Sequence, residues 1–149
     1  MIIIKKTNSD DKDFQALVKE LDLELKVRDG TDHEFYAPMN KTDKIKHALV
    51  AYDIKEPVGC GALREYAPGV MEIKRMFVPV ARRGQGIASA ILSALETWCV
   101  ELECKKCILE TGKKEPEAIQ LYKKNNYNII SNYGPYQNVE NSVCFEKVL

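Results

Sequence analysis

The sequence predicts one α/β domain of the α+β type, residues 1–149, with a mixed sheet of about six to seven strands flanked by helices. Two observations predict this class. Strand-like apolar runs are interspersed with segments whose apolar residues recur at helical spacing. A glycine-rich turn at residues 84–86 joins a strand-like run to a helical one, which indicates a right-handed crossover between parallel strands. The length of 149 residues suits a single domain.

The N-terminal half is predicted to hold a strand, a long helix and a hairpin. Residues 1–7 form the strand, and residues 9–30 have a Ser/Asp cap, apolar side chains at helical spacing and a terminating glycine. Residues 31–43 mix aromatic and charged side chains in a loop of a length that often lines substrate sites. Residues 46–66 predict two strands joined by a turn around Asp53–Pro57.

The C-terminal half is predicted to alternate strands and helices. In chain order these are strand 69–80, helix 86–103, strand 106–112, helix 115–127 and strands 127–131 and 141–149. Pro116 suits a first helical turn, and Asn125 or Asn126 can end that helix in the left-handed conformation. The last two strands are separated by a loop at residues 132–140.

Charge and hydropathy give no argument for nucleic acid or a membrane as partner. Lys and Arg total 22, as do Asp and Glu, so the formal net charge is zero. Three consecutive apolar residues after Met1 are too few for a signal sequence, and no later stretch approaches a membrane span. The default expectation is therefore a soluble cytoplasmic protein.

The five cysteines are predicted to be structural thiols. Cys104 and Cys107 form a C-x-x-C pair, but no further ligands follow at zinc spacing, and His33 and His47 are remote in sequence. We therefore expect no metal site.

The turn after the strand at 69–80 is predicted to bind an anion. It lacks the lysine and hydroxyl of a Walker A loop and the third glycine of a dinucleotide fingerprint. What remains is Arg83-x-x-Gly86-x-Ala88, where small residues let a pyrophosphate approach the N–H groups of a helix start. Arg82 or Arg83 could add charge-assisted bonds. The alternative is a strand-to-helix turn with a solvated basic pair.

The segment EIKRMFVPVARRGQGIASAIL, followed later by EPEAIQLYKKNNY, resembles the GCN5-related N-acetyltransferase (GNAT) superfamily. Arg83, Gly86 and Ala88 match the pyrophosphate pattern [Q/R]-x-x-G-x-[G/A] of that family. The later pattern A-x-x-L-Y-x-x-x-[G/N]-[FY] is matched by Ala118, Leu121, Tyr122, Asn126 and Tyr127. The chain departs from the family at Asn126, which is usually glycine, and at Glu115, where many relatives have asparagine.

The resemblance implies a splayed sheet with acetyl-CoA in the cleft as cosubstrate. It implies that the cofactor-binding residues are Met76, Phe77, Val78, Arg83, Gly84, Gln85, Gly86, Ile87, Ala88 and Ser89. The first three would offer backbone groups to the acetyl carbonyl and the pantetheine arm, because a strand that leaves its neighbour has unpaired N–H groups.

Glu72 and Tyr122 are the predicted general base and general acid. An amine must lose its proton before attack. The strand holds Glu72, Lys74 and Arg75 amid apolar residues, where charges are rare unless paired or functional, and Glu72 matches the position that some GNAT branches use as base. Strict alternation puts Glu72, Lys74, Met76 and Val78 on one face of that strand. Glu72 could instead only pair with Lys74, Arg75 or Arg64.

The Tyr122 hydroxyl would protonate the departing sulfur, or its ring could simply pack that helix on the sheet. A main-chain N–H near Phe77 or Val78 would hold the oxyanion. Neither histidine suggests a Cys-His pair, so we expect direct attack by the amine.

The acceptor is predicted to be a small amine such as an amino acid or amino-carboxylate. Arg64 and Lys74 could hold its carboxylate if both face the cleft, and Tyr133, with Tyr136, could form part of its wall or only pack the loop. The alternatives are a protein lysine or N-terminal acetyltransferase and a non-catalytic acyl-CoA-binding module. GNAT domains often dimerise, so a homodimer is possible.

Overall fold

Seven strands form one mixed sheet in the computed structural model, which describes residues 1–30 and 44–149. The elements in chain order are β1 (Ile2–Thr7), α1 (Lys12–Asp29), β2 (His47–Asp53), β3 (Glu56–Ala67), β4 (Val70–Phe77), α3 (Ile87–Glu101), β5 (Lys106–Gly112), α4 (Pro116–Lys124), β6 (Asn128–Ile130) and β7 (Ser142–Val148). The strands lie in the order β1-β2-β3-β4-β5-β7-β6, and only the β4–β5 pair is parallel. The predicted class and element order are confirmed. The predicted loop at 31–43 lies outside the described residues.

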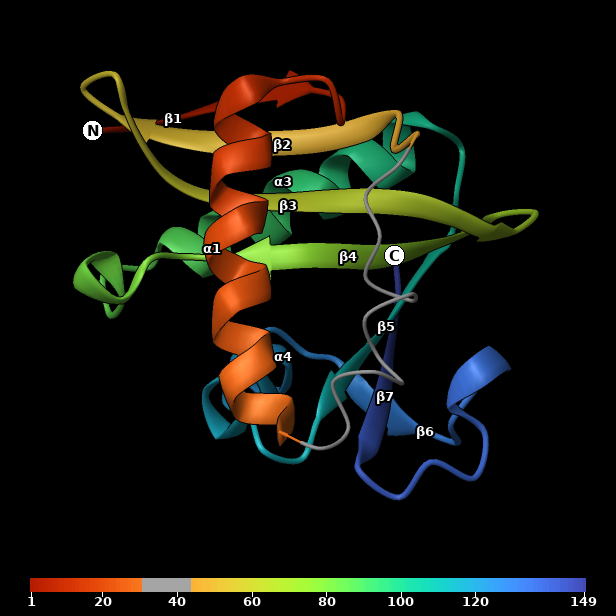
Figure 1. Cartoon of the computed structure of the whole chain (residues 1–149). Coiled ribbons are helices and arrows are strands. Elements are labelled where there is room, and N and C mark those ends of the chain that lie inside the picture. The colour runs from red at the N-terminus through yellow and green to blue at the C-terminus, as the bar shows by residue number, and fades with distance from the viewer. Residues whose placement is uncertain (31–43) are drawn as a thin grey trace.

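Helices cover both faces of the sheet, with α1 on one face and α3 on the other (Figure 1). The helical spacing of Phe14, Leu17 and Leu21 gives α1 one apolar side, which packs with β2 and β3 residues in one core cluster. Ile91, Leu92 and other α3 residues belong to a second cluster, which α4 joins through Tyr122. None of the helices in the described part of the chain combines the length and apolar character needed to cross a bilayer.

Local signals account for most element boundaries. Helix α1 is capped by Asp11, the last residue of the predicted Ser/Asp cap, whose carboxylate accepts the Phe14 N–H at 2.9 Å. The hairpin turn contains Ile54 and Lys55, both with positive φ, as a tight two-residue hairpin requires. Asn126 has a φ of 71°, so the predicted left-handed end of α4 falls there.

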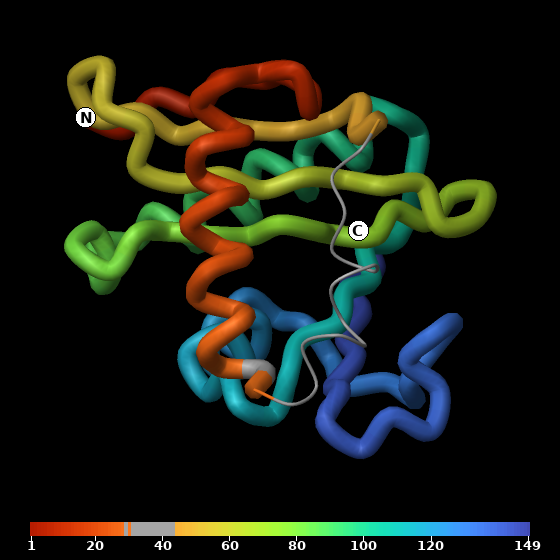
Figure 2. The backbone as a smooth tube through the Cα atoms, in the orientation of Figure 1, coloured from red at the N-terminus to blue at the C-terminus, as the bar shows by residue number. Residues whose placement is uncertain are grey.

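The sheet splays between β4 and β5, as the resemblance implied. Their parallel pairing covers Val70, Met71 and Glu72 of β4, opposite residues 106–108, and ends there. Beyond this point β4 continues alone on that side, while β5 turns away with β7 and β6 (Figure 2). The strand end that precedes the glycine turn therefore faces a gap.

The prediction that Glu72, Lys74, Met76 and Val78 share one face of β4 is wrong, because the strand has a bulge at Arg75. Arg75 has a φ of 59°, and the β3 register shifts from Lys74 opposite Ala62 to Phe77 opposite Cys60. Phe77 therefore packs in the α1 cluster, while Met76 packs in the α3 cluster. Glu72 and Lys74 do not share a face with Met76, because the extra residue reverses the alternation of side chains.

Candidate active site

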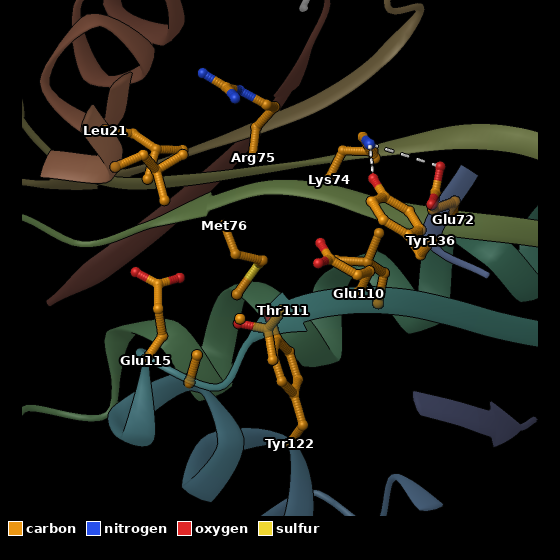
Figure 3. A pocket seen from close by; sticks show the side chains of 14 residues that line it. Leu21, Glu72, Lys74, Arg75, Met76, Glu110, Thr111, Glu115, Tyr122 and Tyr136 are labelled. Atoms are coloured by element: carbon orange, nitrogen blue, oxygen red, sulfur yellow. Dashed lines mark hydrogen bonds and ion pairs between the residues drawn. The ribbon is translucent and has the colours of Figure 1, made fainter. Parts of the chain in front are cut away.

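Two adjoining cavities occupy the gap between β4 and β5. The larger, of about 710 Å³, runs along the end of β4, the glycine turn and the starts of α3 and α4. The smaller, of about 120 Å³, lies among side chains of β4 and β5 (Figure 3). Both are lined by Leu21, Met76, Glu115, Ala118 and Tyr122. These shared residues mark where the two cavities meet.

The glycine turn presents the start of α3 to the larger cavity. Gly84 and Gly86 have φ values of 80° and 82°, which side chains rarely tolerate, and Gly86 is the N-cap of α3. A Cβ at either position would meet no atom within 4 Å. Glycine is therefore required there by the backbone conformation and not by lack of space. The first N–H groups of a helix have no partner inside the helix, and they favour an anion.

Nine of the ten predicted cofactor-binding residues line this cavity. They are Met76, Phe77, Val78, Arg83, Gly84, Gly86, Ile87, Ala88 and Ser89. Gln85 is exposed and is not among the lining residues.

Arg83 is held at the groove by two contacts. Its Nε donates to the Val78 carbonyl at 2.8 Å, and its Nη2 bonds both oxygens of Glu24 at 2.8 and 3.0 Å. Arg82 also lines the groove, but it pairs with Asp53 and Glu56 on the β2–β3 hairpin. Of these two neighbouring arginines, Arg83 is thus the one whose carboxylate partner also lines the groove.

An ion pair connects α1 to α4 at the same groove. The guanidinium of Arg28 bonds both carboxylate oxygens of Glu117, at 3.0 and 3.1 Å, and contacts Glu115 at 3.5 Å. Sequence reasoning missed Glu24, Arg28 and Glu117 at this site. Glu24 and Arg28 lie on α1 and Glu117 lies on α4, and none of them gave a signal, because charged residues on an amphipathic helix usually face solvent.

Glu72 occupies the smaller cavity and is already paired. The residue is 6% exposed, the Tyr133 hydroxyl donates to its Oε2 at 2.5 Å, and Lys74 Nζ lies 3.8 Å from its Oε1. Lys74 Nζ also donates to the Tyr136 hydroxyl at 3.4 Å. Burial lowers the pKa of Lys74, and the negative charge of Glu72 opposes that shift. The position of Glu72 thus satisfies both the base and the ion-pair interpretation.

Tyr122 stands at the junction of the two cavities. Its ring packs against Tyr127 and Phe145, as the packing interpretation expected. Its hydroxyl makes no hydrogen bond to any described residue, and burial raises its pKa above the usual 10.0. The hydroxyl is therefore protonated at neutral pH and available to another group in the cavity.

Glu110 is a second carboxylate in the smaller cavity. It projects from β5 and accepts the Ser142 hydroxyl at 2.7 Å. In the sequence it directly follows the apolar residues Cys107–Leu109, a pattern to which no catalytic or binding role was assigned.

Of the three residues predicted to contact the acceptor, Arg64, Lys74 and Tyr133, only Lys74 lines one of the two cavities. Lys74 lines the smaller cavity, whereas Arg64 is exposed on β3, opposite Glu72, and lines neither cavity. Tyr133 contacts Glu72 and does not line the cavity, while its neighbour Tyr136 does.

The cysteines are reduced and mostly buried. All five are free, and burial raises the pKa of the Cys60 thiol to about 12, so it is a poor nucleophile. Within residues 1–30 and 44–149, no group of three or more potential ligands could hold a metal ion.

Comparison with known proteins agrees with this architecture. The model of the acetyltransferase (GNAT) family matches residues 14–127. An IAA acetyltransferase from Azospirillum brasilense is 34% identical over 102 residues, covering 68% of this chain and 67% of that protein.

Solved structures share the fold over the whole chain. A protein described as an acyl-CoA N-acyltransferase from Klebsiella pneumoniae has a TM-score of 0.84 and 32% identity, covering 100% of this chain and 98% of that one. PaiA N-acetyltransferase from Thermoplasma acidophilum, solved with coenzyme A, has a TM-score of 0.77 at 16% identity, covering 100% of this chain and 99% of that one. The second likeness concerns the fold alone.

A splayed mixed sheet with a glycine turn at its gap defines an acyl-CoA-dependent N-acetyltransferase. The chain belongs to the acetyltransferase (GNAT) family.

Proposed function

We propose that this enzyme transfers an acetyl group from acetyl-CoA to the primary amine of a small molecule, with Glu72 as base and Tyr122 as acid. The observation that carries the proposal is the junction of the two cavities. The groove at the glycine turn meets the carboxylate-containing cavity at Met76 and Tyr122. A donor in the first cavity and an acceptor in the second would therefore meet beside a protonated hydroxyl.

The groove suits the donor by charge and by backbone geometry. The open N–H groups at the start of α3 and the guanidinium of Arg83 would bind the diphosphate of acetyl-CoA. The unpaired edge of β4 from Ile73 to Phe77 would bond the pantetheine arm, because its N–H groups lack a β5 partner.

The proton transfers follow from the positions of the side chains. Glu72 accepts a proton from the acceptor ammonium, directly or through water, which frees the nitrogen lone pair. The nitrogen then bonds to the acetyl carbon, and main-chain N–H groups near Phe77 and Val78 stabilise the resulting oxyanion. As the carbon–sulfur bond breaks and the carbonyl re-forms, the Tyr122 hydroxyl gives its proton to the thiolate. The phenolate left behind takes the extra proton from the acylated nitrogen, which restores the hydroxyl and leaves a neutral amide.

The size of the smaller cavity favours a small acceptor. About 120 Å³ accommodates a molecule such as an amino acid but not a folded protein surface, which would need an open groove. Acetylation of a protein lysine or N-terminus is the second candidate, and binding of acyl-CoA without turnover is the third.

Thiol release from acetyl-CoA, measured over a panel of amines and peptides, tests the proposal. We expect release with small amines, a fall in kcat/KM of about 10²–10⁴-fold for Glu72→Gln, and a fall in kcat for Tyr122→Phe. Binding of coenzyme A with no release on any acceptor would favour the binding module. Release with peptides alone would favour the protein acetyltransferase.

A further inference from the structure

Two neighbouring cations of β4 lie buried on the same side of the sheet. In a regular strand, consecutive side chains point to opposite faces. The bulge at Arg75 breaks this rule, so both Lys74 and Arg75 extend from the same side of β4, while Met76 extends from the other (Figure 3). Both cations line the smaller cavity, and each is at most 9% exposed.

The guanidinium of Arg75 is only partly matched by the protein. Its side chain is 1% exposed, and its Nη2 pairs with Asp22 of α1, which is itself half exposed. Its Nε is buried and has no hydrogen-bond partner among the described residues. A buried charged donor without a partner destabilises a fold, so such a group calls for an explanation.

The rest of the cavity carries the opposite charge. Glu72 and Glu110 line it from β4 and β5, and Thr111 and Tyr136 add hydroxyls. The cavity therefore has cations on one part of its wall and carboxylates on another, within a volume of about 120 Å³. A small molecule with a negative and a positive end suits this lining better than a simple amine does.

We propose that Arg75, assisted by Lys74, binds the carboxylate of an amino acid acceptor and so determines the substrate specificity of this enzyme. The inference rests on the proposed function, which it deepens by assigning the residue that selects the acceptor. An incoming carboxylate would reach the buried Arg75 Nε by a shift of that side chain toward the cavity, and would direct the ammonium end toward Glu72 and Glu110. Arg75 then replaces Arg64 as the anchor, because Arg64 lies outside both cavities.

Paired substrates test the anchor. The best amino acid found in the panel is compared with its carboxamide, which keeps the amine and side chain but loses the negative charge. The wild type is expected to prefer the acid by at least about tenfold in kcat/KM, as a charged hydrogen bond in a buried site permits. Arg75→Gln is expected to remove that preference by raising KM for the acid about 10- to 100-fold, with KM for the amide changed less than about threefold.

Further variants separate recognition from folding. Arg75→Lys keeps the positive charge and is expected to keep part of the preference. Asp22→Asn removes the partner of Arg75 but not the cation, and is expected to keep the preference in full. If Arg75→Gln does not fold, the test uses Arg75→Lys and its ratio of kcat/KM for the amino acid to kcat/KM for the carboxamide. A purely structural role of Arg75 would lower activity on both substrates equally and leave this ratio unchanged.

Three results would overturn the inference. They are a wild-type enzyme that uses the amide as well as the acid, an equal loss on both substrates in the Arg75 variants, and loss of the preference in Arg64→Gln. Calorimetric binding of the amino acid to the coenzyme A complex distinguishes the two proposals. Arg75-dependent binding without thiol release would overturn the proposed chemistry and leave the carboxylate site standing.

Discussion

Most cations at the two cavities are matched to carboxylates from other elements. Arg83 pairs with Glu24, Arg28 with Glu117, and Arg75 with Asp22. Because three of these six residues come from the C-terminal half of α1, that helix sets the electrostatics of a groove whose backbone comes from β4 and α3. Anionic ligands must therefore compete with side chains already in place.

Removal of the carboxylate at Glu24 is expected to tighten coenzyme A binding. Glu24→Gln frees the Arg83 guanidinium for the diphosphate, so Kd measured by calorimetry at low salt should fall about three- to tenfold. Glu20→Gln removes the same charge from an exposed site on α1 and is the matched control. Equal tightening in both variants would indicate a general charge effect, and weaker binding in Glu24→Gln would contradict the prediction.

The Tyr122 hydroxyl is expected to act as an acid over the whole neutral and mildly alkaline range. Burial raises its pKa above 10.0, so it stays protonated at every pH below that value. The ratio of kcat between wild type and Tyr122→Phe should therefore stay constant from about pH 7 to pH 9.5.

Tyr127→Phe is the control for loss of a buried hydroxyl. It removes the bond to Glu96, outside both cavities, and is expected to lower stability without changing kcat. Convergence of the wild-type and Tyr122→Phe rates near pH 8.5 would mean that the hydroxyl ionises early or is not the acid.

At the scale of elements, close packing of α3 on β3 positions the glycine turn. Gly59 and Gly61 leave room for Ile91, and α3 begins directly after the turn. The spacing between strand and helix therefore fixes where the α3 N–H groups lie relative to the end of β4.

Gly61→Ala is expected to be strongly destabilising. Its Cβ would lie 2.8 Å from Met76 Sδ and 2.9 Å from atoms of both Ile91 and Leu95, so α3 or Met76 must move. We expect a loss of about 1–3 kcal/mol in the free energy of unfolding, measured in urea, and weaker coenzyme A binding. The matched control is Gly112→Ala on β5, where the nearest atom is 3.7 Å away. An equal loss of unfolding free energy in both variants would show that the loss comes from backbone flexibility at a glycine and not from the packing of α3 on β3.

The start of α1 depends on the ionised form of Asp11. Burial alone raises the pKa of Asp11, but the Phe14 N–H, the Thr7 hydroxyl and the Lys5 ammonium together lower it below 3.8. A lowered folded-state pKa stabilises the protein above 3.8, and this contribution disappears as the pH falls through the folded value. Asp11→Ala should cost about 1 kcal/mol at pH 7.

Asp11→Asn separates charge from capping, because an amide oxygen still accepts the Phe14 N–H. Urea unfolding at pH 7 and pH 3 should show its deficit relative to wild type shrinking in acid. A deficit that grows in acid would contradict the assigned sign.

The whole molecule consists of two parts that share one core cluster. The parts are β1–β4 with α1 and α3, and β5–β7 with α4, and between them the sheet is continuous over only three register pairs. The apolar cluster nevertheless includes Leu49 from the first part and Phe145 from the second. We therefore expect a single cooperative unfolding transition, in keeping with the predicted single domain.

A ligand bound between β4 and β5 should stabilise the contact between the two parts of the sheet. Coenzyme A is expected to raise Tm and to slow amide exchange in β5 and α4 as well as at the glycine turn, because its groove is lined from both parts. Calorimetry and hydrogen exchange check this. Protection confined to the glycine turn, or two separate transitions without ligand, would contradict it. The cytoplasmic location and the homodimer stay predictions.

The elements, their order and the position of the glycine turn could be predicted from the sequence. These features depend on local signals: apolar periodicity, a proline in a first helical turn, and glycines whose positive φ few other residues adopt. The residues around the turn were found for the same reason, since a short motif keeps them together along the chain.

Which side chains face the cavities could not be predicted from the sequence and became visible in the folded chain. Strict alternation predicted Glu72 and Met76 on one face, but the bulge at Arg75 reverses the alternation. No local pattern in the β4 sequence predicts this bulge. Glu110, Glu24 and Arg28 reach the site from β5 and α1, and Arg64 remains outside it. Strand register and ion pairing depend on partners that are distant in sequence, and a local sequence pattern does not encode those partners.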